Sequence, residues 1–246
     1  MKKFLAVTGM LAFSIISYSE ERASGISIGL VGAHSNGLYK LKSKEKSSFL
    51  PTISANYKNF YINQSEVGYE LPVHENILVL PYFNFLDGAP VKGKDLIEGY
   101  QSLKTRKSQF VGGGRISYLK DNFQSSIFVQ GGKRGSSGGA EVSLSFPLTE
   151  RLSLSTGVNY TVYSKKFTDY YFGIHKEDLG GKLQKVYSPK ASSSYGAEIS
   201  LEYQVAAPLT VFTSASATNY SKQITDSPIT KDKTNISTTV GLQYSF

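Results

Sequence analysis

The most constraining feature of this sequence is a series of segments, each about ten residues long, in which apolar and polar residues alternate. Between residues 195 and 205, apolar side chains occupy every odd position, and Gly, Ser, Glu or Gln occupies every even one. The segments 140–146 and 152–162 follow the same pattern closely. Successive side chains of a β-strand point to opposite faces of the sheet. The pattern therefore predicts an all-β fold whose strands have one apolar and one polar face.

The alternation, together with the turn residues between segments, predicts twelve antiparallel strands. From the amino terminus, the expected strands are 26–34, 49–57, 59–64, 66–71, 76–85, 108–119, 122–132, 137–147, 150–163, 194–205, 208–220 and 235–246. The two short strands between 59 and 71 have the weakest pattern. If they form one strand and the first strand is lost, the count is ten. An even count is typical of a barrel with both chain ends on one side.

Short and long connections alternate along these strands. The short ones are 58–59, 72–76, 120–122, 147–150 and 206–208, and the long ones are 35–48, 86–107, 164–193 and 221–234. Tilted strands of about 9–11 residues cross a bilayer, and tight turns at one end with long loops at the other are typical of outer-membrane barrels. A soluble β-sandwich also alternates. The connection lengths favour a transmembrane antiparallel up-and-down β-barrel over residues 20–246.

The first residues have the order of a secretory signal peptide. Lys2 and Lys3 precede an almost wholly apolar run over residues 4–16, and a polar stretch follows at 17–22. This order is typical of export signals, and the run is shorter than the roughly 20 residues of a membrane-spanning helix. We expect residues 1–19 to be a signal peptide cleaved after Ser19 and the rest to reach the outer membrane. A buried amino-terminal helix is the alternative.

The composition argues against several kinds of functional site. Cysteine is absent, so no disulfide, thiol nucleophile or cysteine metal site can form. The three histidines, His34, His74 and His175, are scattered, and we expect neither a metal nor another cofactor.

The net charge is +8, and basic residues gather in the predicted long loops at Lys40, Lys42, Lys44, Lys46, Lys104, Arg106, Lys107, Lys165 and Lys166. These positions suit the phosphates of outer-membrane lipid and lipopolysaccharide better than nucleic acid. Solvation of loops is the plainer interpretation.

Two groups of residues raise the alternative of a barrel hydrolase. His34 stands beside Ser35 and Asn36, but neighbours in a strand point to opposite faces, so His34 and Ser35 cannot form a nucleophile and its base. Asp169, His175 and Asp178 could form a carboxylate–histidine site in a loop, although ordinary loop charge explains them equally. The sequence therefore favours a non-enzymatic protein.

The same alternation places four charged residues inside the predicted barrel. These are Arg115, Glu141, Glu198 and Glu202. We expect them to form a polar network that partly fills the lumen. Eight-stranded barrels are filled by side chains, whereas barrels of 16 or more strands hold a channel. A small or weakly selective pore is therefore an alternative function.

The final segment resembles the signal that the β-barrel assembly machinery reads during membrane insertion. Thr239, Gly241, Tyr244 and Phe246 carry this resemblance. It implies that the assembly machinery is a partner during biogenesis.

A wider resemblance covers most of the chain after the signal peptide and is sharpest after residue 150. It rests on Tyr170-Tyr-Phe-Gly-Ile174, Tyr187-Ser-Pro-Lys190, the strand pair 195–220, and Thr225-Asp226-Ser227-Pro228-Ile229. These segments resemble the MipA/OmpV outer-membrane proteins. The resemblance implies a barrel without catalytic residues and a scaffold linked to a periplasmic murein hydrolase and synthase. Taken alone, Asp226-Ser227-Pro228 predicts a turn in which the Asp side chain binds its own backbone and Pro228 fixes φ.

The sequence thus predicts a cell-envelope scaffold or surface-contact protein. The predicted turns on the periplasmic side contain only a few residues, and they leave a periplasmic enzyme little surface to bind.

Overall fold

The computed structural model describes residues 24–42 and 46–246, and β-strands account for most of them. The predicted signal peptide, residues 1–19, lies outside the described residues. Within them, no helix is long and apolar enough to cross a membrane.

Antiparallel strands follow one another along the chain. They are β1 (Gly25–Ser35), β2 (Ser47–Tyr57), β3 (Phe60–Asn63), β4 (Glu66–Tyr69), β5 (Leu71–His74), β6 (Ile77–Asp87), β7 (Gln109–Lys120), β8 (Phe123–Gly132), β9 (Gly135–Pro147), β10 (Leu152–Tyr163), β11 (Ser192–Ala206), β12 (Leu209–Tyr220) and β13 (Thr234–Ser245). Two helices, α1 (Lys165–Phe172) and α2 (Lys222–Thr225), and the 3-10 turns Gly93–Asp95 and Lys176–Asp178 lie in the connections.

Consecutive strands pair with each other except for β4 and β5, and two further pairings close the sheet. β1 pairs with β13, where Leu30 lies opposite Leu242, and β4 pairs with β6, where Val67 lies opposite Phe83. The result is a closed barrel, as the alternation predicted.

β4 and β5 are two halves of one strand. Gly68 lies opposite Tyr82 and Leu71 opposite Val79, so the register against β6 is the same in both halves. The hydrogen-bond ladder with β6 is interrupted opposite Pro81, because proline has no N–H to donate. Counted as one strand, β4 and β5 bring the total to twelve, which confirms the prediction of twelve strands and excludes the alternative of ten.

One predicted boundary is wrong. We expected residues 72–76 to form a turn, but β5 continues through Pro72 to His74, and only Glu75 and Asn76 turn the chain. Pro72 lies opposite Leu78, and the register shifts between Pro72 and His74. This irregularity lets a proline sit in a strand.

The two faces of the wall differ in chemistry. Exposed side chains such as Ile199, Leu201 and Val240 point outward, whereas Ser155, Ser194 and Thr239 point inward and are buried. An apolar outer surface is what lipid requires of a transmembrane barrel.

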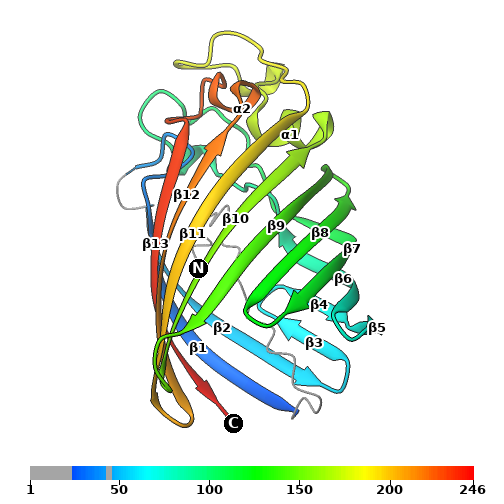
Figure 1. Cartoon of the computed structure of the whole chain (residues 1–246). Helices are drawn as coiled ribbons and strands as arrows, with labels where there is room; N and C mark the ends of the chain where they lie inside the picture. The colour runs from blue at the N-terminus through cyan, green and yellow to red at the C-terminus, as the bar shows by residue number, and fades with distance from the viewer. Residues whose placement is uncertain (1–23, 43–45) are drawn as a thin grey trace.

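The two ends of the barrel also differ. Figure 1 shows α1, α2 and the long connections gathered at one end, whereas the carboxyl terminus lies at the other. We name these the loop end and the turn end. At the turn end, the connections 58–59, 75–76, 121–122 and 207–208 contain two residues each.

Candidate functional site

The long connections at the loop end fold into a layer with its own hydrophobic core. We name this layer the cap and define it as residues 36–42, 88–108, 164–191 and 221–233. Its core, completed by Tyr220 at the end of β12, comprises Leu38, Tyr39, Ala89, Val91, Leu96, Leu103, Phe167, Tyr171, Phe172, Ile174, Leu183, Tyr220, Ile224 and Ile229. We described these segments as loops from the sequence, and the alternation gave no sign that they pack together. The signal that could have revealed the cap is their content of large apolar residues.

Helix α1 brings aromatic side chains into this core. Ser164 caps it by accepting a hydrogen bond from the Phe167 N–H, as serine does at helix starts. Phe167 and Tyr171 are four residues apart, so both face the same side and are buried. The Phe167 ring stacks on Tyr163 at 4.8 Å between centroids and lies 4.7 Å from the ring of Tyr171.

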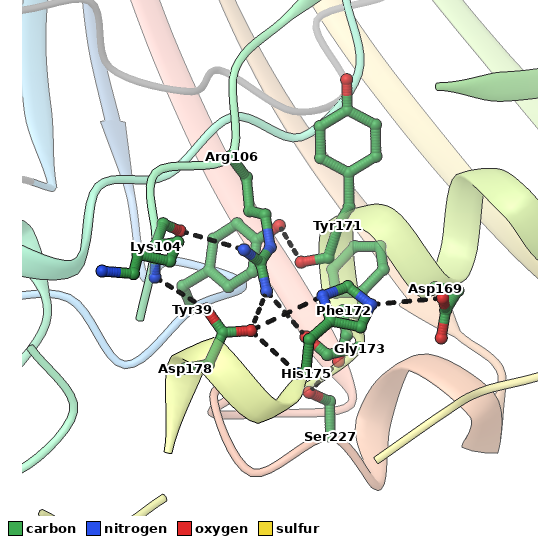
Figure 2. A network of polar contacts seen from close by, with 10 residues as sticks. All are labelled: Tyr39, Lys104, Arg106, Asp169, Tyr171, Phe172, Gly173, His175, Asp178 and Ser227. Carbon is green, nitrogen blue, oxygen red and sulfur yellow. Dashed lines mark hydrogen bonds and ion pairs between the residues drawn. The ribbon is translucent and has the colours of Figure 1, made fainter. Parts of the chain in front are cut away.

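A buried ion pair joins two connections of the cap. The Arg106 guanidinium lies 2.5 Å from a carboxylate oxygen of Asp178, and the two side chains are 4% and 0% exposed. Figure 2 shows the two groups facing each other, with Arg106 also donating to the backbone carbonyls of Lys104 and Gly173. Arg106, expected at the lipopolysaccharide rim, is therefore an internal residue. The Asp178 carboxylate neutralises its positive charge, because a buried guanidinium without a counterion is strongly destabilising.

The Asp178 carboxylate is also bound by backbone groups. The N–H groups of Lys104 and His175 donate to its oxygens at 2.8 and 2.9 Å. Burial acts to raise the pKa of Asp178, but the hydrogen bonds from Arg106 and the two backbone groups outweigh it. They hold the pKa of Asp178 below its ordinary value.

Tyr39 ties the first connection to the second and third. Its hydroxyl donates to the carbonyls of Ala89 at 2.8 Å and Tyr171 at 3.2 Å, and its ring stacks on Phe172. Burial, with a smaller contribution from Tyr171, raises the pKa of Tyr39 well above its ordinary value. Tyr39 therefore acts as a neutral hydrogen-bond donor.

The predicted carboxylate–histidine group does come together in the cap. His175 Nε2 lies 3.2 Å from Asp169 and His175 Nδ1 lies 3.6 Å from Asp178. The Ser188 hydroxyl donates to Asp169 at 2.9 Å. Asp169 thus lies between the Ser188 hydroxyl and the His175 ring, and His175 contacts both carboxylates. Among the described residues, no group of His, Asp and Glu is arranged to hold a metal ion.

His34 and Ser35 are separated, as the alternation predicted. His34 Nδ1 is 2.9 Å from the Ser47 hydroxyl, whereas the Ser35 hydroxyl donates to Asn235 at 2.7 Å. His34 is exposed and Ser35 is half-buried, as expected for neighbours in a strand.

The motif Thr225-Asp226-Ser227-Pro228 forms the end of α2 and its exit. Asp226 caps the helix through its backbone N–H, which donates to the carbonyl of Lys222 at 2.9 Å. The Ser227 hydroxyl donates to the carbonyl of Phe172 at 2.6 Å, and the Pro228 carbonyl accepts from Lys40 Nζ at 2.6 Å. The motif therefore fastens the last connection to α1 and to the first connection.

The lumen contains a second polar group of residues, centred on Arg115. Arg115 on β7 reaches across β6 to Glu66 on β4 at 3.3 Å, and Tyr61 donates to the same carboxylate at 2.8 Å. The guanidinium also lies 5.1 Å above the ring of Tyr82. Glu141 on β9 accepts a hydrogen bond from the Ser126 hydroxyl at 3.4 Å.

The other two predicted members of the network lie elsewhere on the wall. Glu198 and Glu202 are both on β11, and the alternation directs both inward. Glu66, the direct partner of Arg115, was missed, because it begins one of the two strands with the weakest alternation.

The residues of the predicted insertion signal occupy both faces of β13. Thr239 and Gly241 are buried on the inner face, and Tyr244 is exposed on the outer one. The rings of Tyr244 and Phe246 pack edge to face at 4.9 Å.

Positive charge is concentrated at the loop end. Among the described residues, 19 Lys and Arg residues lie in the connections 36–42, 46, 88–108, 133–134, 164–191 and 221–233, together with only seven Asp and Glu residues. The loop end is therefore strongly basic, whereas the remainder of the described chain is acidic.

The chain is similar to known outer-membrane proteins along its whole length. It is 32% identical over 256 residues to the 24 kDa outer membrane protein of Pasteurella multocida (strain Pm70), a match that covers 100% of this chain and 99% of that protein. Among solved structures, an outer membrane channel from Pseudomonas putida F1 matches with a TM-score of 0.51 at 8% identity, over 93% of this chain and 97% of that one. The NanC porin matches with a TM-score of 0.50 at 8% identity, over 88% and 98%. These two likenesses show the fold alone.

The family comparison covers almost all of the barrel. The model of the family described as "MltA-interacting protein MipA" matches residues 28–246. The protein is an outer-membrane barrel whose loop end faces outward, since long connections of such barrels are external. By this match and the closed twelve-stranded fold, the chain belongs to the MipA family.

Proposed function

We propose that this protein is a non-enzymatic surface-contact protein of the outer membrane. Its barrel anchors the cap, and the cap holds lysines at fixed positions against the phosphates of surrounding lipopolysaccharide. The observation that carries this proposal is the cap itself. Its four connections share one buried core and a buried ion pair, so the exposed lysines stand on a folded surface.

The distribution of charge supports an anionic partner outside the cell. Lys165, Lys166 and Lys190 are exposed on the cap. Basic residues near an anionic lipid surface contribute about 1 kcal/mol each at low salt. An ordered surface also binds at a lower cost in conformational entropy than mobile loops do.

The turn end supports a periplasmic scaffold less well. The family description names an interaction with MltA, but four connections at this end contain two residues each. A specific protein interface commonly buries about 800 Å² on each partner. Four two-residue turns provide little of that area, so we place the principal contact surface of this chain at the cap.

The test measures binding of fluorescent lipopolysaccharide to the folded barrel in neutral detergent. Replacing Lys165, Lys166 and Lys190 with Gln should weaken binding at low salt by about fivefold per lysine, and wild-type binding should fall as salt increases. The matched control replaces three exposed basic residues of the turn end, Lys58, Lys120 and Arg151, with Gln. Equal loss of binding in both variants would refute contact through the cap.

Conductance in a planar bilayer tests the alternative of a pore. With the cap over the loop end, the inserted protein should give no discrete openings. Reproducible steps would show a continuous water path, and solute passage would then replace surface contact as the proposed function.

A further inference from the structure

The barrel wall is incomplete on one side. β2 runs over Ser47–Tyr57, yet it pairs with β3 only over Ser54–Tyr57. On the other side of the β3–β4 hairpin, β6 pairs with β4 no further than Asn84. In the part of the chain that the structure describes, the outer half of β2 therefore has β1 as its only neighbouring strand.

We name this interruption the notch. Its sides are Ser47–Ile53 of β2 and Asn84–Asp87 of β6, and the turn Gln64–Ser65 forms its floor. Hydrogen bonds from Gln64 N–H to the Ile53 carbonyl and from Phe85 N–H to the Ser65 carbonyl mark where the ladder ends. Above the notch, Leu41 pairs with Leu96 and links the first two cap connections.

The depth of the notch places it in the outer half of the bilayer. The four residues of β3 span about 13 Å along the strand. The apolar band of an outer-membrane barrel is about 25 Å tall. With a strand tilt of roughly 40°, the β3–β4 hairpin covers less than half of that band. The notch therefore faces the acyl chains of the outer leaflet.

The free edge of β2 is adapted to lack a neighbouring strand. The Ile53 carbonyl is directed toward the notch. Because backbone polar groups alternate in direction along a strand, those of Pro51, two residues away, are directed toward it as well. Proline has no N–H, so this edge presents one fewer unpaired donor to the membrane.

The side chains around the notch are apolar on the outer face, and on the inner face Leu50 lies between the polar residues Ser48 and Thr52 of β2, with Asn84 on β6. On the outer face, Phe49 lies on the β2 side of the notch and is 76% exposed. On the β6 side, the rings of Phe83 and Phe110 stack with 5.4 Å between their centroids. On the inner face, β1, β2, β6 and β7 carry the aliphatic residues Val31, Ala33, Leu50, Leu78, Leu80, Val111 and Leu119. Within the described residues, the inward positions of β8–β13 carry no Val, Leu or Ile. The aliphatic part of the lumen thus adjoins the notch.

We propose that the notch binds an acyl chain of a phosphorylated outer-leaflet lipid, which passes between β2 and β6 and rests against Leu50 on the inner face. The phosphate is held at the rim by Lys46 and Lys94. Lys46 precedes β2 and Lys94 lies in the connection above the notch, where the Lys94 carbonyl accepts a hydrogen bond from Lys42. This proposal does not depend on lipopolysaccharide binding by the cap.

The absence of tryptophan from the chain makes a direct test available. Single tryptophans are introduced by Leu50→Trp at the notch, Phe128→Trp on the inner face of the complete wall, and Ile199→Trp on the outer face. Each variant is reconstituted in vesicles of phosphatidylglycerol brominated on its acyl chains, and a heat-dependent gel shift shows that it is folded. Bromine quenches only tryptophans that acyl chains reach.

Quenching of Leu50→Trp should approach that of Ile199→Trp and exceed that of Phe128→Trp at least twofold. Leu50→Trp that is quenched no more than Phe128→Trp would overturn the proposal. If Leu50→Trp does not fold, Asn84→Trp reports from the opposite side of the notch with the same two outcomes. If the tryptophan is unquenched and the protein can be cross-linked as a dimer, the edge of β2 is instead covered by a second copy of the chain. That result would also overturn the proposal.

The phosphate is tested with the same Leu50→Trp protein. Brominated phosphatidylglycerol should compete with unbrominated lipid more effectively than brominated phosphatidylcholine does. The double substitution Lys46→Gln and Lys94→Gln should reduce this preference by about fivefold per lysine. The matched control, Lys165→Gln with Lys166→Gln on α1, should retain it. Equal quenching by the two brominated lipids would overturn the assignment of the phosphate to Lys46 and Lys94.

Discussion

At the scale of single residues, Asp178 organises the cap. Its carboxylate accepts hydrogen bonds from Arg106 and from two backbone N–H groups that belong to different connections. Removing one partner of a buried ion pair leaves an uncompensated charge, which costs far more than losing an exposed pair. The cap should therefore depend on Asp178 more than on any partly exposed carboxylate around it.

Asp178→Asn should destabilise the cap by about 4 kcal/mol, because Arg106 would remain buried without its counterion. Hydrogen exchange at the amides of Lys104 and His175, which bind Asp178, measures the loss directly. Asp169→Asn is the control, because Asp169 is 30% exposed and should contribute no more than about 1 kcal/mol. Equal protection in wild type and Asp178→Asn would contradict a structural role for the ion pair.

The lowered pKa of Asp178 predicts how the cap responds to acid. Since the folded pKa lies below the ordinary value of about 3.9, the contribution is fully present above pH 4 or so. It should decline as the pH falls through the folded pKa. The protection factors of the cap amides, which are the intrinsic exchange rates at each pH divided by the observed rates, should therefore be constant from neutral pH to about pH 4 and decrease below it. Asp178→Asn should show a weaker acid dependence in this range, and an identical profile would contradict the assignment.

At the scale of elements, prolines and glycines decide where strands pair and how closely they pack. Pro81 divides β4 from β5, and Pro51 lies on the free edge of β2. Gly241 on β13 lies opposite Phe212 on β12, and a Cβ at this glycine would collide with the Phe212 ring. A residue of the predicted insertion signal thus also has a packing role in the folded barrel.

Gly241→Ala should destabilise the barrel by about 1–3 kcal/mol, because the Phe212 ring must move. The added change Phe212→Leu should restore much of this stability by making room for the methyl group. Gly114→Ala is the matched control, since a Cβ there meets no atom within 4 Å. The fraction of protein that keeps the compact gel mobility after mild heating measures all three. A failure of Phe212→Leu to rescue would locate the effect in membrane insertion instead.

At the scale of the whole molecule, charge is separated along the barrel axis. The loop end is basic, whereas the lumen carries Glu66, Glu141, Glu198 and Glu202 and, among the described residues, a single inward cation, Arg115, which pairs with Glu66. Because Arg115 on β7 binds Glu66 on β4 across β6, it joins the strands beside the notch. The stability of the entire barrel should therefore respond to this one residue.

Arg115→Ala should leave the Glu66 carboxylate without its cation and cost about 3 kcal/mol. The temperature at which the folded gel band converts to the unfolded one should fall by about 10 °C. Arg151→Ala, at an exposed position of the turn end, should change it little. Unchanged melting and unchanged permeability of Arg115→Ala would rule out the polar network as a structural element.

The sequence by itself determined the barrel, because alternation with a period of two is a local property that can be read residue by residue. It sets the faces of strands such as β11, the count of twelve and the division into long and short connections. Even the two weakest strands, 59–64 and 66–71, are present as β3 and β4. The prediction of a turn over residues 72–76 was wrong at Pro72. Local preference assigns a proline to a turn, but the pairing of β5 with β6 accommodated this one within a strand.

Only the tertiary structure decided the cap, the Glu66–Arg115 pair and the notch. Arg106 and Asp178 are 72 residues apart, and Arg115 and Glu66 are 49 apart. Contacts over such distances have no period in the sequence, because they depend on how closed strands bring separate connections together. The notch likewise exists only relative to its neighbours, since a short β3 leaves an opening only where the longer β2 and β6 extend beyond it.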